Sequence, residues 1–184
     1  SLTRNPGLTA PIPEEINNFA TLQILNLSMN KFDGLIDHVS IFNPSSNLNV
    51  LDLSWNNFSG PLANINFSST SLQQLDLSYN EFNSPQVPIW LFEFNQLQTL
   101  SLRGCGLSGA FPYQLASLPR LQNMNVDDNN LNGTLYIGNI SSLNRKLHNG
   151  IIDGHLQSLS LTKNDISYVD YNSSDIHDVT IAIM

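Results

Sequence analysis

Acid–base, nucleophilic and metal chemistry would have to come from a small set of side chains in this sequence. The four histidines are His38, His148, His155 and His177. No two of them have the spacing of a metal site, and none stands beside a nucleophile and an acid in one motif. Asp127 and Asp128 are adjacent, and neighbouring residues of a strand point to opposite sides, so they should not converge on one cation. We therefore expect no catalytic residue, no cofactor and no metal site, and the chain is not predicted to be an enzyme.

A second kind of chemistry is glycosylation. Asn-x-Ser/Thr tripeptides accept N-linked glycans only in the secretory pathway. Six of them are present. A chain rich in Asn and Ser contains some by chance, but this number favours passage through the secretory pathway. We predict glycans at Asn57, Asn66, Asn132, Asn139 and Asn172. Asn26 is the exception, because its position in the repeat described below faces the inner surface, where a glycan would obstruct contact.

Composition narrows the choice of partner. Seven basic residues stand against fifteen acidic ones, and the formal net charge of -8 opposes binding to nucleic acid or to anionic lipid. A basic or neutral ligand is favoured on this ground alone. No apolar run approaches the roughly 20 residues that cross a bilayer, so no membrane-spanning segment is expected in this chain. Its first residues do not begin a signal peptide, and we expect any targeting or anchoring segment to lie outside it.

The element that must position these residues is a repeat, Leu-x-x-Leu-x-Leu-x-x-Asn. Full copies begin at Leu22, Leu48, Leu72, Leu97, Leu121 and Leu156. The interval is 24 to 26 residues except before the last copy, where it is 35, and Ile176, Val179 and Ile181 form a truncated seventh copy. Repeats of this length and wording build leucine-rich-repeat solenoids with one strand per coil. The prediction is an α/β solenoid: a curved right-handed coil of about seven repeats, with a parallel β-sheet on its concave face and residues 1–184 as one domain.

Within each copy the alternating leucines should point into the core, and the asparagine should satisfy backbone groups where the chain bends. Stacked asparagines would form a ladder. Cys105 replaces the asparagine in the fourth copy. We interpret it as a buried thiol that fills the bend, since a redox cysteine would need exposure and a lowered pKa.

The residues between the leucines define a predicted binding surface on the concave face. Its members are Met29, Asp52, Trp55, Asp76, Tyr79, Arg103, Asn123, Asn125, Asp127 and Lys163. Exposed aromatic side chains such as Trp55 and Tyr79 are typical binding anchors. Two other interpretations stay open. Asp52 and Asp76 occur in the commonest wording of the repeat and could be purely structural, and single exposed aromatic side chains are normal on protein surfaces.

A further pattern follows the strands. In Leu107-x-Gly109-x-Phe111-Pro112 the glycine permits a bend and the proline is expected to stop any helix there. The segment resembles the Leu-x-Gly-x-Ile-Pro signature of plant extracellular leucine-rich repeats. Val87-Pro88-Ile89-Trp90 and the segments around it have a narrower resemblance, to membrane-proximal ectodomains of subfamily VIII plant receptor-like kinases.

This resemblance implies the ectodomain of a receptor-like kinase, which recognises an extracellular peptide, a small ligand or a co-receptor and signals through a kinase domain absent from this chain. It places the chain at the extracellular face of the plasma membrane. Ectodomains of the family carry cysteine pairs in terminal caps, so the single cysteine predicts a fragment without caps. The alternative is a secreted inhibitor or defence protein that blocks a cell-wall-degrading enzyme.

The irregular connection 131–154 is longer than the others and holds two of the tripeptides and the basic pair Arg145-Lys146. Long loops on repeat scaffolds often serve recognition. They are also tolerated as neutral insertions, because closing a longer loop costs little additional entropy. The sequence does not decide between these alternatives.

Overall fold

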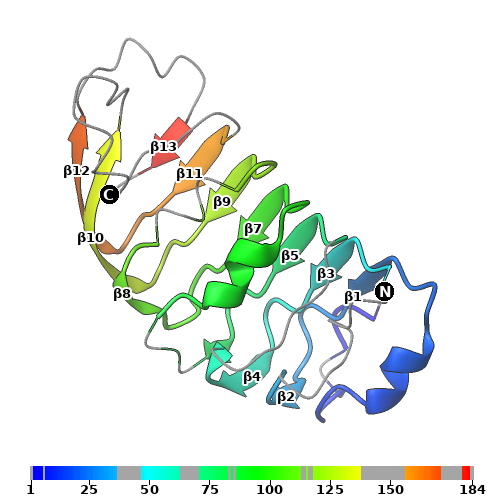
Figure 1. Ribbon diagram of the computed structural model, residues 1–184. Helices are drawn as coiled ribbons and strands as arrows, with labels where there is room; N and C mark the ends of the chain where they lie inside the picture. The colour runs from blue at the N-terminus through cyan, green and yellow to red at the C-terminus, as the bar shows by residue number, and fades with distance from the viewer. Residues whose placement is uncertain are drawn as a thin grey trace.

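The computed structural model describes residues 2–5, 7–36, 47–62, 71–82, 84, 86–112, 115, 118–137, 156–170 and 180–182. Its main element is a parallel sheet of seven strands, which lie side by side along the length of the molecule in the order of the chain (Figure 1). The strands are β1 (Ile24–Asn26), β3 (Val50–Asp52), β5 (Gln74–Asp76), β7 (Thr99–Ser101), β9 (Asn123–Asn125), β11 (Ser158–Ser160) and β13 (Thr180–Ala182). The predicted leucine-rich-repeat solenoid is confirmed, and each repeat contributes one strand to this inner sheet.

The register of the inner sheet is constant. The central residues pair in an unbroken line, which runs Leu25, Leu51, Leu75, Leu100, Met124, Leu159 and Ile181. From Leu25 to Leu159 these central side chains are buried, as are the leucines two residues further along. Each coil therefore hides its apolar row against the coils on either side, as the repeat pattern predicts.

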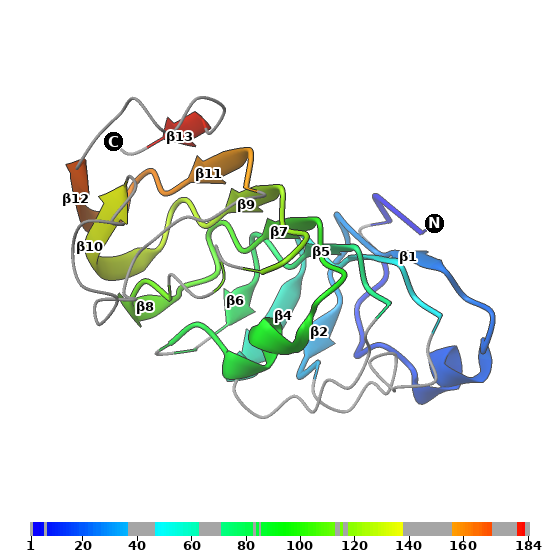
Figure 2. The ribbon, with the colours of Figure 1, turned by 45° about the horizontal axis from the view of Figure 1, so that its top comes forward.

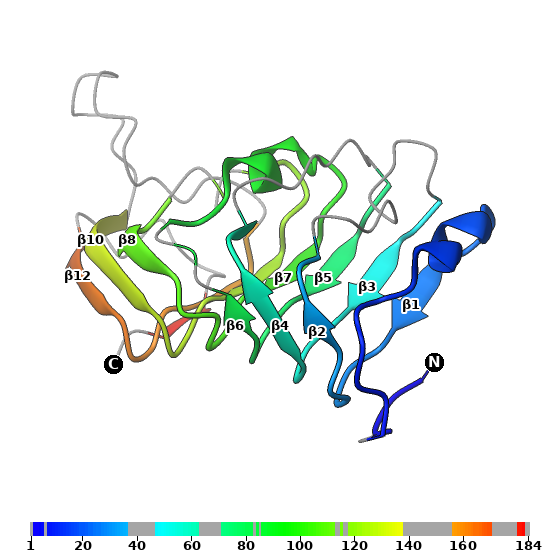
Figure 3. The ribbon, with the colours of Figure 1, turned by 90° about the horizontal axis from the view of Figure 1, so that it is seen from below.

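A second layer of strands lies across the solenoid from the inner sheet (Figures 2 and 3). One three-stranded sheet consists of β2 (Asp33–Gly34), β4 (Asn57–Gly60) and β6 (Glu81–Phe82); another consists of β8 (Ser108–Ala110), β10 (Asn130–Ile137) and β12 (Asp165–Asp170). The bend predicted at Gly109 is observed, and the glycines of three other coils resemble it: Gly34, Gly60, Gly109 and Gly133 all have positive φ, between 79° and 112°. Strand β10 also shows that the connection 131–154 begins as regular structure, and residues 138–154 lie outside the described part.

Two 3-10 helices lie wholly within the described residues, η1 (Glu14–Asn18) and η4 (Ile89–Glu93). A proline marks the start of each of these helices. Pro13 and Pro88 come directly before the two helices, with φ of -68° in each case. A proline at the start of a helix loses nothing, because the first N–H groups have no partner within the helix.

The predicted asparagine ladder lies where each coil turns away from the inner sheet. Its members are Asn30, Asn56, Asn80, Asn129 and Asn164. Asn56 is representative: its Nδ2 donates to the carbonyl of Leu53 in its own coil and to that of Leu27 in the preceding coil, and its Oδ1 accepts from the Phe32 N–H. One side chain thus joins two coils and satisfies buried backbone groups in both.

Cys105 occupies the ladder position of the fourth coil and is fully buried, as predicted. Its Sγ donates to the Leu77 carbonyl at 3.3 Å. Burial raises the pKa of the Cys105 thiol far above its usual value, and the nearby Asp76 carboxylate adds to this effect. The thiol is therefore protonated and structural.

Candidate functional site

The residue before each ladder position adopts a left-handed backbone conformation, and this turns its side chain away from the core. We call these residues the inner row: Arg4, Met29, Trp55, Tyr79, Gly104, Asp128 and Lys163. Their φ angles all lie between 54° and 60°. The row crosses the coils at the end of the inner sheet, so residues about 25 positions apart in the sequence become neighbours.

An aromatic pair forms the centre of the inner row. The ring centroids of Trp55 and Tyr79 are 4.0 Å apart, with an interplanar angle of 31°. Trp55 is still 51% exposed, and Met29 beside it is also exposed. Arg4 donates its Nε–H to the sulfur of Met29 at 3.3 Å. Aromatic rings on a rigid backbone bury a large area on contact at a low cost in conformational entropy, so this pair is suited to binding.

Charged groups continue the row beyond the aromatic pair. The Arg103 guanidinium lies 5.4 Å from the centre of the Tyr79 ring, and its Nε donates to Asp128 Oδ2 at 2.7 Å. Lys163 Nζ lies 2.7 Å from the other Asp128 oxygen. The Lys163 and Arg103 hydrogen bonds lower the pKa of the Asp128 carboxyl, and the Asp128 bond raises the pKa of Arg103. An uninterrupted chain of contacts therefore runs from Trp55 to Lys163.

Asp52 and Asp76 lie on neighbouring strands and serve the backbone. Asp52 Oδ1 accepts from the N–H and the hydroxyl of Ser54, and its Oδ2 accepts from Asn26 Nδ2. Asp76 Oδ1 accepts from the Ser78 N–H. Burial raises the pKa of Asp76, and the negative charge of Asp52 adds to the rise, although the Ser78 bonds oppose it. The contacts of both carboxylates fit the structural alternative.

Asp127 was wrongly placed on the exposed surface. It is 6% exposed and turns toward the next coil, where its Oδ1 accepts from the Thr162 N–H and the Ser160 hydroxyl, both at 2.7 Å. These two bonds depend on which residue ends each strand of the inner sheet. Asn or Asp at the last strand position accepts the N–H two residues later, as Asn125 does for Asp127. Strand β11 has Ser160 at this position, and the preceding coil supplies the acceptor for Thr162.

The same substitution occurs once more. Strand β7 ends in Ser101, and the Arg103 N–H bonds to Ser78 Oγ of the preceding coil at 3.2 Å. Ser78 is buried and also bonds to the Ser101 hydroxyl. Of the remaining predicted surface residues, Asn123 is exposed and Asn125 is half-buried.

Sequence reasoning missed three members of the row, Arg4, Gly104 and Asp128. Arg4 could have been found, because Leu2-x-x-Asn5 repeats the end of the motif. The Leu2 and Arg4 N–H groups bond to the Asn26 and Ser28 carbonyls, which places residues 2–5 beside β1. Asp128 could be assigned only by knowing that the row consists of the residues with left-handed backbone and not of the residues before them.

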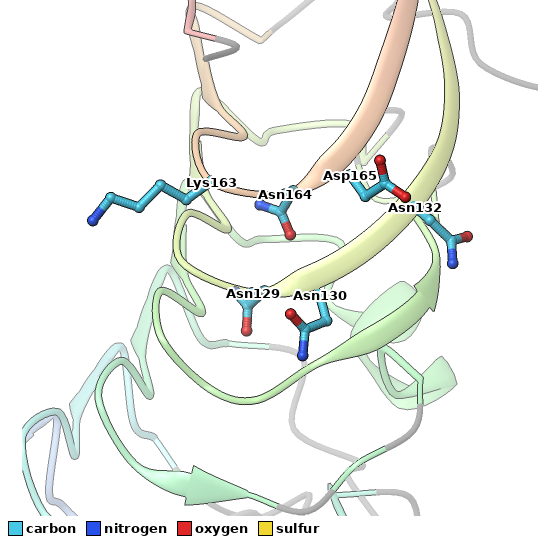
Figure 4. A pocket seen from close by; sticks show the side chains of 6 residues that line it. All are labelled: Asn129, Asn130, Asn132, Lys163, Asn164 and Asp165. Carbon is cyan, nitrogen blue, oxygen red and sulfur yellow. The ribbon is translucent and has the colours of Figure 1, made fainter.

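A polar hollow of about 460 Å³ lies beside this end of the row (Figure 4). It is lined by Asn129, Asn130, Asn132, Lys163, Asn164 and Asp165. The Lys163 side chain extends away from the others, and the Asn129 and Asn164 amides are used in the ladder. The hollow therefore gathers no set of charged groups. In the described part of the chain, no three metal-ligating side chains come together.

The described sequons differ in accessibility. Asn57 and Asn132 are exposed on β4 and β10, whereas Asn66, Asn139 and Asn172 lie outside the described residues. Asn26 Nδ2, the atom that would carry a glycan, donates to Asp52 at 2.9 Å, and its Oδ1 accepts from the buried Ser28 hydroxyl.

We expect mass spectrometry of tryptic peptides from protein secreted by plant cells to find glycans on Asn57 and Asn132 and none on Asn26. Asn57→Gln and Asn132→Gln should each remove the mass of one glycan, and Asn26→Gln should remove none. A glycan on Asn26 would contradict this interpretation of its contacts.

Comparison with known proteins agrees with the fold. Two family models, both described as Leucine Rich Repeat, match residues 96–118 and residues 45–61, 68–85 and 155–169. The chain is 35% identical to "Receptor-like protein 6" of Arabidopsis thaliana over 196 residues, which cover 88% of this chain and 18% of that protein. Among the helices that are described, none is long and apolar enough to cross a bilayer.

Two solved structures from Arabidopsis thaliana are similar. The ectodomain of the receptor kinase GASSHO1/SCHENGEN3, in complex with CASPARIAN STRIP INTEGRITY FACTOR 2, has a TM-score of 0.64 and 30% identity, and the match covers 86% of this chain and 17% of that one. The ectodomain of the receptor kinase SOBIR1 has a TM-score of 0.57 and 30% identity, over 70% of this chain and 67% of that one. This chain therefore spans less than a fifth of the first of these ectodomains and of the receptor-like protein. The narrower resemblance, to subfamily VIII, stays a prediction.

The coils, the ladder and these similarities lead to one assignment: the chain belongs to the leucine-rich-repeat family and resembles the ectodomains of plant receptor kinases.

Proposed function

We propose that this chain is a recognition segment of a plant cell-surface receptor and that it binds an extracellular polypeptide along the inner row, without catalysis. The observation that carries the proposal is the half-exposed Trp55 ring packed against Tyr79 within a continuous row of contacts. The backbone of each row member is fixed by its own coil and the side chains by contacts between coils, so the surface is formed before a partner arrives, and this lowers the entropic cost of binding.

The similar proteins support the kind of partner and the location. One was solved with CASPARIAN STRIP INTEGRITY FACTOR 2 bound to a receptor kinase ectodomain, and another is a receptor-like protein. By analogy we propose a peptide or a co-receptor as the partner, the extracellular face of the plasma membrane as the location, and a kinase, in the same protein or in a co-receptor, as the signalling component. Residues 1–184 as a single domain belong to the same proposal.

The exposed charge of the row supports an acidic group on the partner. Lys163 and Arg103 side chains are 71% and 38% exposed, whereas Asp128, which they share, is only 19% exposed. The outward-facing charge at this end of the row is therefore positive. This differs from the basic or neutral ligand expected from the net charge of -8, because the sum over a whole chain says little about one surface.

Trp55→Ala is expected to weaken binding of the partner by about tenfold or more, since buried aromatic anchors commonly contribute about 2 kcal/mol or more. Partners would be captured from plant extracellular fluid with the glycosylated protein, and the affinity of each purified partner would then be measured by calorimetry. The matched control is Ile89→Ala, which removes an even more exposed apolar side chain from η4, away from the row.

Equal loss of affinity in both variants, or no loss in either, would remove the inner row from the binding site. If the partner that depends on Trp55 is a cell-wall-degrading enzyme, the secreted-inhibitor alternative replaces the receptor proposal.

A further inference from the structure

Gly104 is the one member of the inner row without a side chain, and the Tyr79 ring lies over it. A Cβ atom on Gly104 would stand 2.9 Å from Tyr79 Cδ1 and 3.1 Å from Cε1. The first distance is shorter than real Cβ contacts and the second is shorter than most of them, so the ring occupies the space that a side chain at position 104 would need. The gap in one coil holds the aromatic side chain of the coil before it.

We propose that Gly104 is a positioning residue of the binding surface: its missing side chain seats the Tyr79 ring, and this placement forms the Trp55–Tyr79–Arg103 surface before the partner binds. The inference rests on the proposed function for its binding consequence. Its geometric part is independent of any partner.

Backbone conformation alone does not explain the glycine. Gly104 has φ of 60°, which glycine adopts freely. However, Met29, Trp55, Tyr79, Asp128 and Lys163 adopt almost the same φ at the equivalent positions of their coils, and none of them is glycine. The turn therefore tolerates a side chain in this repeat. What distinguishes position 104 is the neighbouring ring.

The placement of the ring links the two halves of the row. With Tyr79 over Gly104, the centroid of its ring lies 4.0 Å from the centroid of the Trp55 ring. The Arg103 guanidinium lies 5.4 Å from the same Tyr79 centroid. Arg103 belongs to the same coil as Gly104 and reaches Asp128, so its side chain carries the contacts across the coil that contributes no side chain to the row. A side chain at position 104 would displace the ring and separate the aromatic pair from the charged residues.

Fluorescence can follow the ring because the chain has two tryptophans in contrasting surroundings. Trp55 is half-exposed and stacked on Tyr79, whereas Trp90 is buried and donates its Nε1–H to the Leu62 carbonyl. Acrylamide quenching at the surface therefore reports on Trp55. In Gly104→Ala we expect faster quenching of Trp55, a smaller near-ultraviolet circular dichroism signal, and affinity for the captured partner reduced by about 2- to 10-fold, the range that an aromatic pair contributes.

Two further variants separate displacement of the ring from backbone strain. Gly106→Ala introduces a side chain at another positive φ, 68°, in the same turn, where it meets the Phe82 carbonyl and not the row. It should lower the melting temperature and leave the Trp55 signals unchanged. In a Tyr79→Ala background, Gly104→Ala should no longer alter Trp55 quenching, because the ring it displaces is absent.

Unchanged Trp55 quenching and circular dichroism in folded Gly104→Ala would overturn the inference, as would an equal change in the Tyr79→Ala background. If the spectroscopic changes appear but partner affinity is unaffected, the positioning role in binding is refuted while the geometry stands. Loss of the proposed function itself is recognised separately, by a Trp55→Ala variant that binds normally.

Discussion

Replacing Leu100 with alanine is expected to lower the free energy of unfolding by about 2–5 kcal/mol, the range for a buried leucine whose site cannot collapse. Leu100 is fully buried and lies in register between Leu75 and Met124 of the adjacent coils. The cavity would therefore open on the interfaces with both neighbours. Urea unfolding followed by circular dichroism measures the loss.

Because each coil contacts only its neighbours, the damage should also be local. Amide hydrogen exchange in Leu100→Ala should increase first in β5, β7 and β9. Leu2→Ala makes the same chemical change at an exposed position and should cost well under about 1 kcal/mol. Exchange that increases equally in every coil would count against a solenoid stabilised by nearest neighbours.

Asn129→Ala is expected to cost a comparable amount, about 2–5 kcal/mol, although it removes no apolar contact of similar size. Asn129 Oδ1 accepts from the N–H groups of Cys105 and Leu107, and its Nδ2 donates to the Leu102 and Val126 carbonyls. Alanine leaves these buried groups without a partner, and each unsatisfied N–H costs about 1–3 kcal/mol. Chemical denaturation of the purified variant gives the value.

The adjacent asparagine is the natural control for this experiment. Asn130 is exposed on β10, so Asn130→Ala should change stability by no more than about 0.5 kcal/mol. Asn129→Asp keeps an acceptor for the two N–H groups but loses the bonds that Nδ2 donates to Leu102, Val126 and Asp127, and should therefore destabilise as well. If Asn129→Ala were as mild as Asn130→Ala, the ladder would not be a source of stability in this chain.

The architecture was predictable because it repeats. The spacing of Leu51, Leu75 and Leu100 predicted their alignment in adjacent parallel strands, and each of these pairings is observed. The ladder followed from the physical need to satisfy a buried bend, and even Cys105 could be assigned to it from position alone. Because the motif recurs in six full copies, the prediction of the fold rests on several occurrences of the same pattern. A single copy of the motif would not have been sufficient.

The surface was less predictable, because it depends on contacts between coils and not on the motif of one coil. Asp127 was taken as exposed, yet it is buried like Ser28, Ser54 and Ser78 at the same position of their coils, and its carboxylate bonds to Ser160, which lies 33 residues later. The contact of Tyr79 with Gly104 likewise depends on the absence of a side chain at position 104 of the next coil. Such pairs cannot be predicted from the motif of a single repeat. The Trp55→Ala experiment tests whether the surface binds a partner.

Repeat genes grow and shrink by duplication and loss of whole units, and the bonds of Asp127 bear on where such exchange succeeds. The coils that end their strands in Asn26, Asp52 or Asp76 cap their own turns, and any neighbour can precede them. In the coil with Ser160, the acceptor for the Thr162 N–H is Asp127 of the preceding coil, so these two coils must be inherited together. A crossover between them would place Ser160 after an unrelated coil and leave the Thr162 N–H without its acceptor. The same holds for the coil of Ser101, whose Arg103 N–H bonds to Ser78 of the preceding coil. Crossovers in front of the coils that cap their own turns would leave these bonds intact.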